Sequence, residues 1–204
     1  MATNADNKLL SVRGELIVDT AQKLFFKHGF DETSLEMIIN ETGGSRRSIY
    51  NDFGNKQGLL IAVIERHLDE KTQMLTTINR ELPIAAALND LCFRFAQSML
   101  SETLISLHRL IVQQVVKLPE LGDMVFERGP MKAVLPLAQY LEELTITKEL
   151  TVPDAHFAAQ MLLEMSKARL HTRSLLLPNT LASDEEIKSQ VAQAVSIFLK
   201  AHRQ

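Results

Sequence analysis

Apolar residues recur at helical spacing along almost the whole chain, and this periodicity constrains the fold more than any other feature. In residues 9–28 the apolar side chains that share one helix face are Leu10, Ile17, Ala21, Leu24 and Phe25. No stretch alternates convincingly between apolar and polar residues with the period of two that marks a half-buried strand. The sequence therefore predicts an all-α fold.

Glycine and proline interrupt the periodic segments, and these interruptions indicate where helices end. Lys27 and His28 precede Gly29, a pattern typical of a helix C-terminus with a glycine cap. The expected helices cover residues 9–28, 35–42, 46–52, 56–80, 84–102, 104–117, 120–127, 131–147, 154–177 and 184–202.

The N-terminal part of the chain has the plan of a helix-turn-helix. Two short expected helices are separated by Gly43 and Gly44. The sequence TSLE at 33–36 matches a capping box in which the Thr33 hydroxyl caps the first of these helices. We expect a DNA-binding domain of residues 1–56 and a second helical domain of residues 57–204. No flexible linker is visible, so the two domains are expected to share the long helix at 56–80.

The second short helix carries the residues with the most specific chemistry. Seven helical residues span about 10 Å, which is comparable with the width of the DNA major groove. Ile49 and Phe53 can anchor one side, and Arg46, Arg47, Tyr50 and Asn51 remain for the other. Arginine pairs with guanine edges and asparagine with adenine, whereas a tyrosine hydroxyl donates to phosphate.

Three further polar residues flank this helix or lie on it. Ser45 can cap it, and Ser48 can reach a phosphate or a base edge. Lys56 lies at the start of the next helix, where backbone N–H groups and positive charge favour a phosphate. The sequence thus predicts a compact surface with the polar groups that DNA binding uses.

The charge balance supports only a local anion-binding surface. The whole chain carries a formal charge of −3, and residues 1–56 hold seven lysines and arginines against eight acidic residues. Within 45–56, three cations face one anion. A solvated helical hairpin with incidental arginines is the alternative that these residues leave open.

From Ala21 to Val63 the sequence resembles the DNA-binding domain of TetR-type transcriptional regulators. The matching stretches are AQKLFFKHGFDETSLEMI and ETGGSRRSIYNDFGNKQGLLIAV. The resemblance implies that residues 46–52 form the recognition helix. It implies base contacts from Arg46, Arg47, Ser48 and Asn51, and phosphate contacts from Thr33, Ser45, Tyr50 and Lys56. Two residues depart from the usual pattern: Gly44 replaces a branched apolar residue, which is expected to loosen the turn, and Arg47 replaces an often small residue, so an operator cannot be transferred from relatives.

The second domain is expected to mediate dimerisation. The fragment LPELGDMVFERGP resembles the AcrR- and AefR-like branch of the family, which implies a helical effector and dimerisation domain whose last two helices pair with a second copy. Apolar stripes on the last two expected helices agree with this. They comprise Phe157, Met161 and Ala168, and then Ile187, Val191, Val195 and Phe198. A purely intramolecular core is the alternative.

An adaptable apolar site for a small molecule is also expected, because the chain has eight methionines and nine phenylalanines. Core packing is the alternative for each lining residue, and His108 among apolar neighbours is typical of a core histidine. The expected lining residues are Met99, Leu107, His108, Ile111, Met124, Phe126, Met131 and Met165.

The sequence gives little support for an enzyme, a metal-binding protein, or a secreted or membrane protein. The sequence contains no GxSxG, HExxH or P-loop motif, and no catalytic residue, metal site or cofactor is predicted. The single cysteine, Cys92, excludes an intramolecular disulfide and is expected to be buried rather than redox-active. Without a secretory signal or an apolar span, a cytoplasmic protein that does not bind membranes is expected.

The function predicted is that of a homodimeric regulator, most simply a repressor that leaves its operator when an apolar or amphipathic ligand binds. Its expected partners are double-stranded operator DNA, a second copy of the chain and a small-molecule effector. A second domain that docks a protein instead of a ligand is the alternative.

Overall fold

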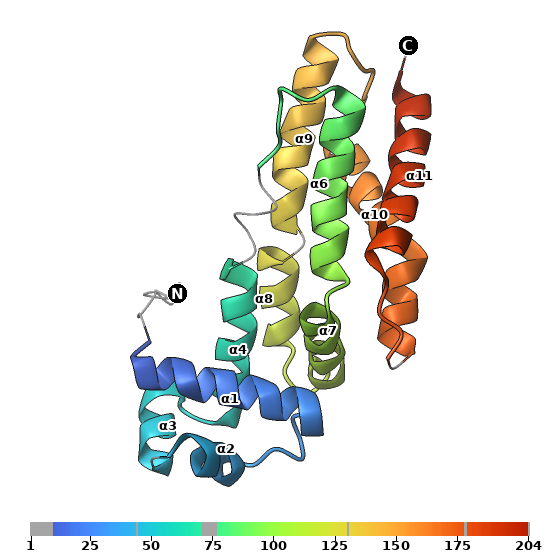
Figure 1. Ribbon diagram of the computed structural model, residues 1–204. Helices are drawn as coiled ribbons and strands as arrows, with labels where there is room; N and C mark the ends of the chain where they lie inside the picture. The colour runs from blue at the N-terminus through green and yellow to red at the C-terminus, as the bar shows by residue number, and fades with distance from the viewer. Residues whose placement is uncertain (1–9, 44, 71–76, 130, 178, 204) are drawn as a thin grey trace. The chain divides into compact units, whose positions relative to one another are not determined.

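The computed structural model describes residues 10–43, 45–70, 77–129, 131–177 and 179–203, and every regular element in these ranges is a helix (Figure 1). The predicted all-α fold is confirmed. The chain divides into two compact units, Met1–His67 and Leu68–Gln204. The division falls inside one helix, so residues 57–67 group with the first unit.

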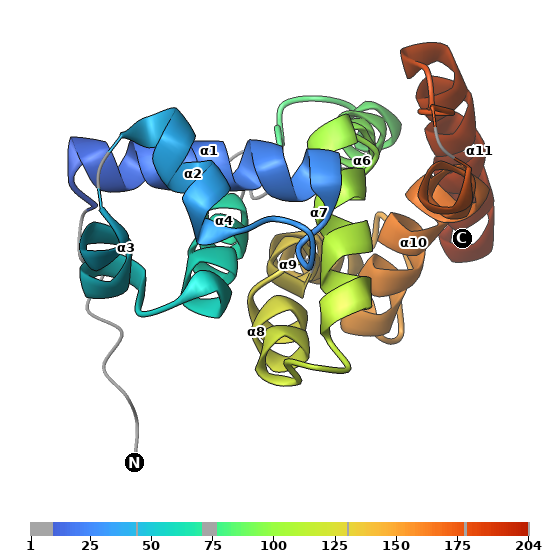
Figure 2. The same ribbon diagram turned by 90° about the horizontal axis from the view of Figure 1, so that it is seen from below.

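Four helices build the first unit: α1 (Val12–His28), α2 (Leu35–Thr42), α3 (Arg46–Phe53) and the first part of α4 (Lys56–Glu70). In both views α2 lies beside α1 and α3 (Figures 1 and 2). Apolar side chains from all four helices are buried, and they include Ile17, Phe25, Ile38, Ile49, Leu59, Leu60 and Ile64. The spacing that predicted these helices therefore reflects one shared core.

The predicted capping box at 33–36 is wrong. Ser34 caps α2 instead, because its hydroxyl accepts a hydrogen bond from the Met37 N–H at 3.2 Å. The hydroxyl of Thr33 donates to the carbonyls of Leu24 (3.2 Å) and Gly29 (2.8 Å). Carbonyls at a helix C-terminus have no partner within the helix, so Thr33 satisfies the end of α1 and cannot also cap α2.

The expected helix at 56–80 is too long. α4 ends at Glu70 in the described residues, and residues 77–79 are not helical. The Asn79 side chain accepts a hydrogen bond from the Glu81 N–H at 3.0 Å, a local contact that competes with helix formation. Ile78 is still buried, but it joins the core of the second unit from a non-helical segment. Residues 71–76 of the expected helix lie outside the described residues.

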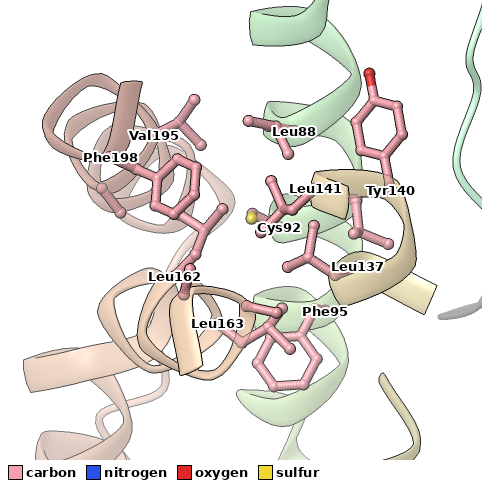
Figure 3. Close-up of a cluster of buried hydrophobic side chains, with 14 of the residues drawn as sticks. Leu88, Cys92, Phe95, Leu137, Tyr140, Leu141, Leu162, Leu163, Val195 and Phe198 are labelled. Atoms are coloured by element: carbon pink, nitrogen blue, oxygen red, sulfur yellow. The ribbon is translucent and has the colours of Figure 1, made fainter. Parts of the chain in front are cut away.

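The second unit contains α6 to α11, which are Ile84–Met99, Glu102–Gln114, Glu120–Arg128, Met131–Ile146, Ala155–Leu176 and Asp184–His202. Within it, α10 packs against α6, α9 and α11. Figure 3 shows Leu88 and Cys92 converging with Leu141, Val195 and Phe198 in the shared core. Burial raises the pKa of the Cys92 thiol to about 12, and the prediction that this cysteine is buried is confirmed.

Polar contacts connect the last two helices. The guanidinium of Arg173 on α10 donates to both carboxylate oxygens of Glu186 on α11, at 2.7 and 2.8 Å. Glu186 also completes a capping box with Ser183 at the start of α11. The hydrogen bonds from Arg173 and from the Ser183 backbone lower the pKa of Glu186 to about 2. This arrangement determines where α11 begins.

Candidate functional site

α3 presents its polar side to solvent. Ile49 is 1% exposed and anchors the helix to the first unit. Arg46, Arg47, Tyr50 and Asn51 are all exposed. α3 therefore has the two sides that its sequence predicts. One side carries the buried apolar anchor, and the other carries two guanidiniums, a phenol and an amide.

Glycines shape both ends of this helix. Gly43, before α3, and Gly54, after it, have φ values of +65° and +75°, which other residues rarely adopt. The guanidinium of Arg13 on α1 donates to the Gly43 carbonyl at 2.8 Å. The turn between α2 and α3 is thus tied to α1, and this contact helps to set the direction in which α3 points. Gly44 lies outside the described residues.

Arg46 forms an ion pair with Glu36 of α2. Both side chains remain largely exposed, at 65% and 49%, so the pair lies in water and contributes little to stability. A base contact by Arg46 requires this carboxylate to be exchanged for a nucleic-acid partner.

The two serines at the start of α3 differ in their exposure to solvent. Ser45 occupies the N-cap position with extended backbone, but its side chain makes no cap hydrogen bond. Its hydroxyl lies 3.4 Å from that of Ser48, which is half-buried. Ser45 is therefore placed where a phosphate contact is sterically open, whereas Ser48 is less accessible.

Two residues expected to bind phosphate have other partners. Thr33 is fully buried, with its hydroxyl used by the end of α1. The ammonium of Lys56 donates to the carbonyls of Phe30 (2.8 Å), Asp31 (3.2 Å) and Thr33 (2.8 Å). It also lies 4.5 Å from the centroid of the Phe30 ring. In this structure Lys56 closes the α1–α2 turn, a role that the spacing of residues along the chain did not indicate.

Family models match both units. Residues 17–63 match the family described as bacterial regulatory proteins, tetR family, and residues 86–204 match the AefR-like transcriptional repressor, C-terminal domain. The second match alone covers more than half of the chain. This chain belongs to the TetR family. It is a DNA-binding transcriptional regulator with an AefR-like C-terminal domain and not an enzyme, as the sequence predicts.

Individual relatives agree with this assignment. The transcriptional repressor ComR of Escherichia coli strain K12 is 36% identical over 76 residues, or 34% of this chain and 36% of ComR. The match thus spans about a third of ComR. A TetR-family regulator from Mesorhizobium loti has a TM-score of 0.81 at 23% identity, over 94% of this chain and 97% of that chain, which shows the common fold.

A second solved structure is that of SmeT, the repressor of the Stenotrophomonas maltophilia multidrug efflux pump SmeDEF. Its TM-score is 0.65 at 25% identity, over 95% of this chain and 91% of that chain. No described helix of the present regulator is both long and apolar enough to cross a membrane. Its described histidine, cysteine and acidic side chains form no group of three or more that suits a metal ion.

Four of the seven predicted dimer-interface residues lie in the regulator's own core. Ile187, Val191, Val195 and Phe198 are each at most 3% exposed and pack within the second unit. Their assignment to an interface is a correction, because one face of α11 is used to cover α6 and α10. Apolar periodicity identified the buried face but not the partner that buries it.

The other predicted interface residues are at the surface. Phe157 and Met161 are 58% and 43% exposed on α10, and Ala168 is also exposed. On α11, Ile197 is 59% exposed, a residue that sequence reasoning missed because it lies off the apolar stripe.

The predicted ligand-site residues differ widely in burial. Leu107 is buried, and Met99, His108, Ile111, Met124 and Met165 are half-buried. Phe126 is 73% exposed on α8, so it does not line an interior site in this structure. The side chain of Met131 lies outside the described part of the structure. Met99 and Met165 pack against the main core, which matches the alternative of ordinary packing for these two.

His171 of α10 is a buried polar residue that sequence reasoning missed. Its ring lies 5.1 Å from that of His108 on α7, measured between centroids. Burial, the nearby Lys167 charge and His108 lower the pKa of His171 to about 4, with Glu164 acting in the opposite direction. Burial and Lys167 also lower the pKa of His108. Both imidazoles are neutral at pH 7.

This burial predicts a pH-dependent stability. Between pH 6.5 and about 4, the unfolded chain binds a proton at His171 that the folded protein excludes, so the free energy of unfolding falls as the pH falls. The expected loss is about 1–3 kcal/mol, since one pKa unit corresponds to 1.36 kcal/mol. Urea unfolding across this range should show a shallower dependence for His171→Gln. The exposed His156 supplies the control, and identical curves for His171→Gln and His156→Gln would contradict the prediction.

Proposed function

We propose that this regulator is a homodimeric repressor that leaves its operator when a small apolar or amphipathic molecule binds the second unit. The observation that carries the DNA-binding part is the outward presentation of Arg46 and Arg47 on a helix anchored by the buried Ile49. Paired guanidiniums on a short exposed helix suit guanine edges in the major groove. The match to an AefR-like repressor domain and the likeness to SmeT support repression.

The DNA contacts divide between bases and phosphates. Arg46, Arg47 and Asn51 are assigned to bases, with Ser48 as a weaker candidate because it is half-buried. Tyr50 and Ser45 are assigned to phosphates, since both are exposed at the sides of the same helix. Thr33 and Lys56 are left out of this assignment because their polar groups bind backbone carbonyls.

A second copy of the chain is the proposed occupant of the exposed apolar surface on α10 and α11. Phe157, Met161 and Ile197 are large apolar side chains in water, which suits an interface between copies. A two-fold dimer would present two copies of α3 to a symmetric operator. The family relationship supports this choice of partner.

Phe157→Ala is expected to weaken the dimer roughly tenfold, because truncating a large interface aromatic typically costs 1–2 kcal/mol. Sedimentation over a range of protein concentrations measures the dissociation constant. Phe126→Ala removes another exposed ring, 73% exposed on α8, and serves as the control. Equal dissociation constants for the two variants would place the interface elsewhere.

Effector binding would release the operator by shifting the protein from its DNA-binding form to a form that does not hold DNA. The effector must bind more tightly to the form that does not hold DNA, because equal affinity for both forms shifts nothing. In the proposed mechanism, the bound effector favours a dimer whose two α3 helices no longer fit both half-sites.

Selection of genomic fragments with the purified full-length protein tests the proposal. Recovery of one symmetric motif is expected, and enrichment without a shared motif would refute sequence-specific repression. A lipophilic small molecule extracted from the purified protein would support the sensor. Protein that yields none, and whose DNA complex no small molecule dissociates, would favour a second unit that docks a protein partner.

A further inference from the structure

Three basic side chains meet where α7 and α10 face each other in the second unit. Lys167 and His171 come from α10 and His108 from α7. Lys167 and His171 are only 8% and 9% exposed, and the two imidazole rings are in contact. Basic residues are rarely buried together unless something neutralises or hydrogen-bonds them.

The partners seen in the structure only partly meet that requirement. The ammonium of Lys167 donates to a carboxylate oxygen of Glu164 at 2.5 Å. Glu164 itself is 61% exposed, so the carboxylate that pairs with Lys167 lies mostly in water. Arg109, the residue after His108 on α7, donates to the backbone carbonyls of Ser174 and Leu175.

His171 has an unmet polar atom. Its Nε2 is buried and has no hydrogen-bond partner in the part of the chain that the structure describes. Buried polar atoms in folded proteins nearly always have a partner, so this nitrogen is open to a hydrogen bond with an ordered water or a bound ligand. Apolar residues lie next to the cluster in sequence on both helices, where Leu107 and Leu170 are buried.

The backbone of α10 is strained at the same place. Ala168, directly after Lys167, has φ 22° and ψ −122°, at a kink that joins two helical segments of α10. Such a conformation is costly for a residue with a Cβ and occurs preferentially at ligand sites and switches. Ala168 is exposed, on the helix that carries Phe157 and Met161. The basic cluster and the proposed dimer surface are therefore joined through one strained residue.

We infer that Lys167, His171 and His108 recognise the carboxylate of an apolar monocarboxylic acid, and that such an acid is the effector. This inference rests on the proposed function, because it names the chemistry of the effector for the same unit. The ammonium supplies one positive charge, and the two neutral imidazoles supply hydrogen-bonding groups. Together they suit a single carboxylate, which carries one negative charge and accepts hydrogen bonds. A cationic ligand would be repelled by Lys167, whereas a carboxylate would give the buried ammonium a second charged partner beside the largely exposed Glu164.

Calorimetry on the full-length protein with matched acids and amides tests the inference. The probes are decanoate and 4-phenylbutyrate, each compared with its uncharged primary amide. At least one acid is expected to bind about tenfold more tightly than its amide, which corresponds to 1.4 kcal/mol. Lys167→Met should abolish this difference, whereas Lys188→Met, which removes an exposed lysine from α11, should preserve it.

Proton uptake provides a readout that a merely structural role would not affect. A carboxylate bound beside His171 raises the pKa of the imidazole, against the opposing charge of Lys167, so the acid should bind together with a fraction of a proton. His108 and Glu164 face the same site and contribute to this balance. The heat of binding should therefore differ between phosphate and Tris buffers at one pH for the acid and not for the amide.

The variants are chosen so that folding does not obscure the result. Lys167→Met replaces a buried charge with an apolar side chain of similar length, and the Glu164 carboxylate that it leaves unpaired is largely exposed to water. His171→Phe, a second variant, keeps a ring at this position and should also weaken acid binding. Melting curves show whether both variants are folded.

Three results would overturn the inference: amides that bind as tightly as acids, acid binding unchanged in Lys167→Met, or no acid binding at millimolar concentration. Release of selected DNA fragments is measured separately. An acid that binds without releasing DNA would keep the carboxylate site and remove the proposed induction mechanism.

Discussion

Replacing both Arg46 and Arg47 with alanine is expected to weaken binding to the selected operator by about 2–6 kcal/mol, roughly 30-fold to 10⁴-fold. Each arginine that reads a base edge contributes about 1–3 kcal/mol of discrimination. Both guanidiniums are exposed on α3, whose position depends on the buried Ile49 and not on the arginines. The double variant should therefore remain folded. Arg46 also loses its ion pair with Glu36, which lies in water and contributes little to stability.

Titration of labelled operator and of random duplex, each at several salt concentrations, separates base reading from charge neutralisation. Base reading predicts a larger loss on operator than on random DNA, and relaxed preference at the positions that each arginine reads. Lys23→Ala with Lys27→Ala removes two exposed charges from α1 and is the matched control. An equal loss on both kinds of DNA would assign Arg46 and Arg47 to phosphates.

Lys56→Met is expected to lower the free energy of unfolding of the first unit by about 2–4 kcal/mol. The ammonium donates to three carbonyls in the α1–α2 turn. Hydrogen bonds from charged groups contribute about 1.5–3 kcal/mol each. The total expected here is smaller, because some of these carbonyls can bind water instead when the ammonium is removed. Its contact with the Phe30 ring adds about 0.5–1 kcal/mol. Methionine keeps most of the aliphatic length but removes every donor.

Urea unfolding followed by a signal from the first unit measures this loss, and Lys23→Met, at an exposed position of α1, is the control. DNA titration at a temperature where Lys56→Met is folded should give an unchanged dependence on salt. If stability is unchanged and the salt slope falls by about one, Lys56 binds phosphate as the family resemblance implies, and the turn contacts are secondary.

The bounds of most helices follow from local chemistry and were predictable. Gly29, Gly43 and Gly54 end α1, α2 and α3, and a positive φ at each is required by the turn itself. The extent of α4 was less predictable, because Ile78 continues the apolar period although it is buried from a non-helical segment. Periodicity reports which side chains are buried and does not report the backbone that carries them.

Side-chain partners that are distant in sequence were not predictable. Lys56 binds carbonyls more than twenty residues earlier, and Thr33 binds the end of α1, so two expected phosphate contacts became parts of a turn. The pairing of His108 with His171 likewise depends on how α7 and α10 meet.

By itself the sequence determined the helical class, the helix-turn-helix plan and the exposed chemistry of α3, because spacing, glycine turns and an apolar anchor act over a few residues. Tertiary structure decided whether an apolar stripe meets its own chain or a second one. Val195 and Phe198 are buried against α6 and α10, whereas Phe157 and Ile197 remain in water. The physical reason is that the hydrophobic effect has no direction, so a pattern of apolar residues requires burial without specifying the surface that provides it.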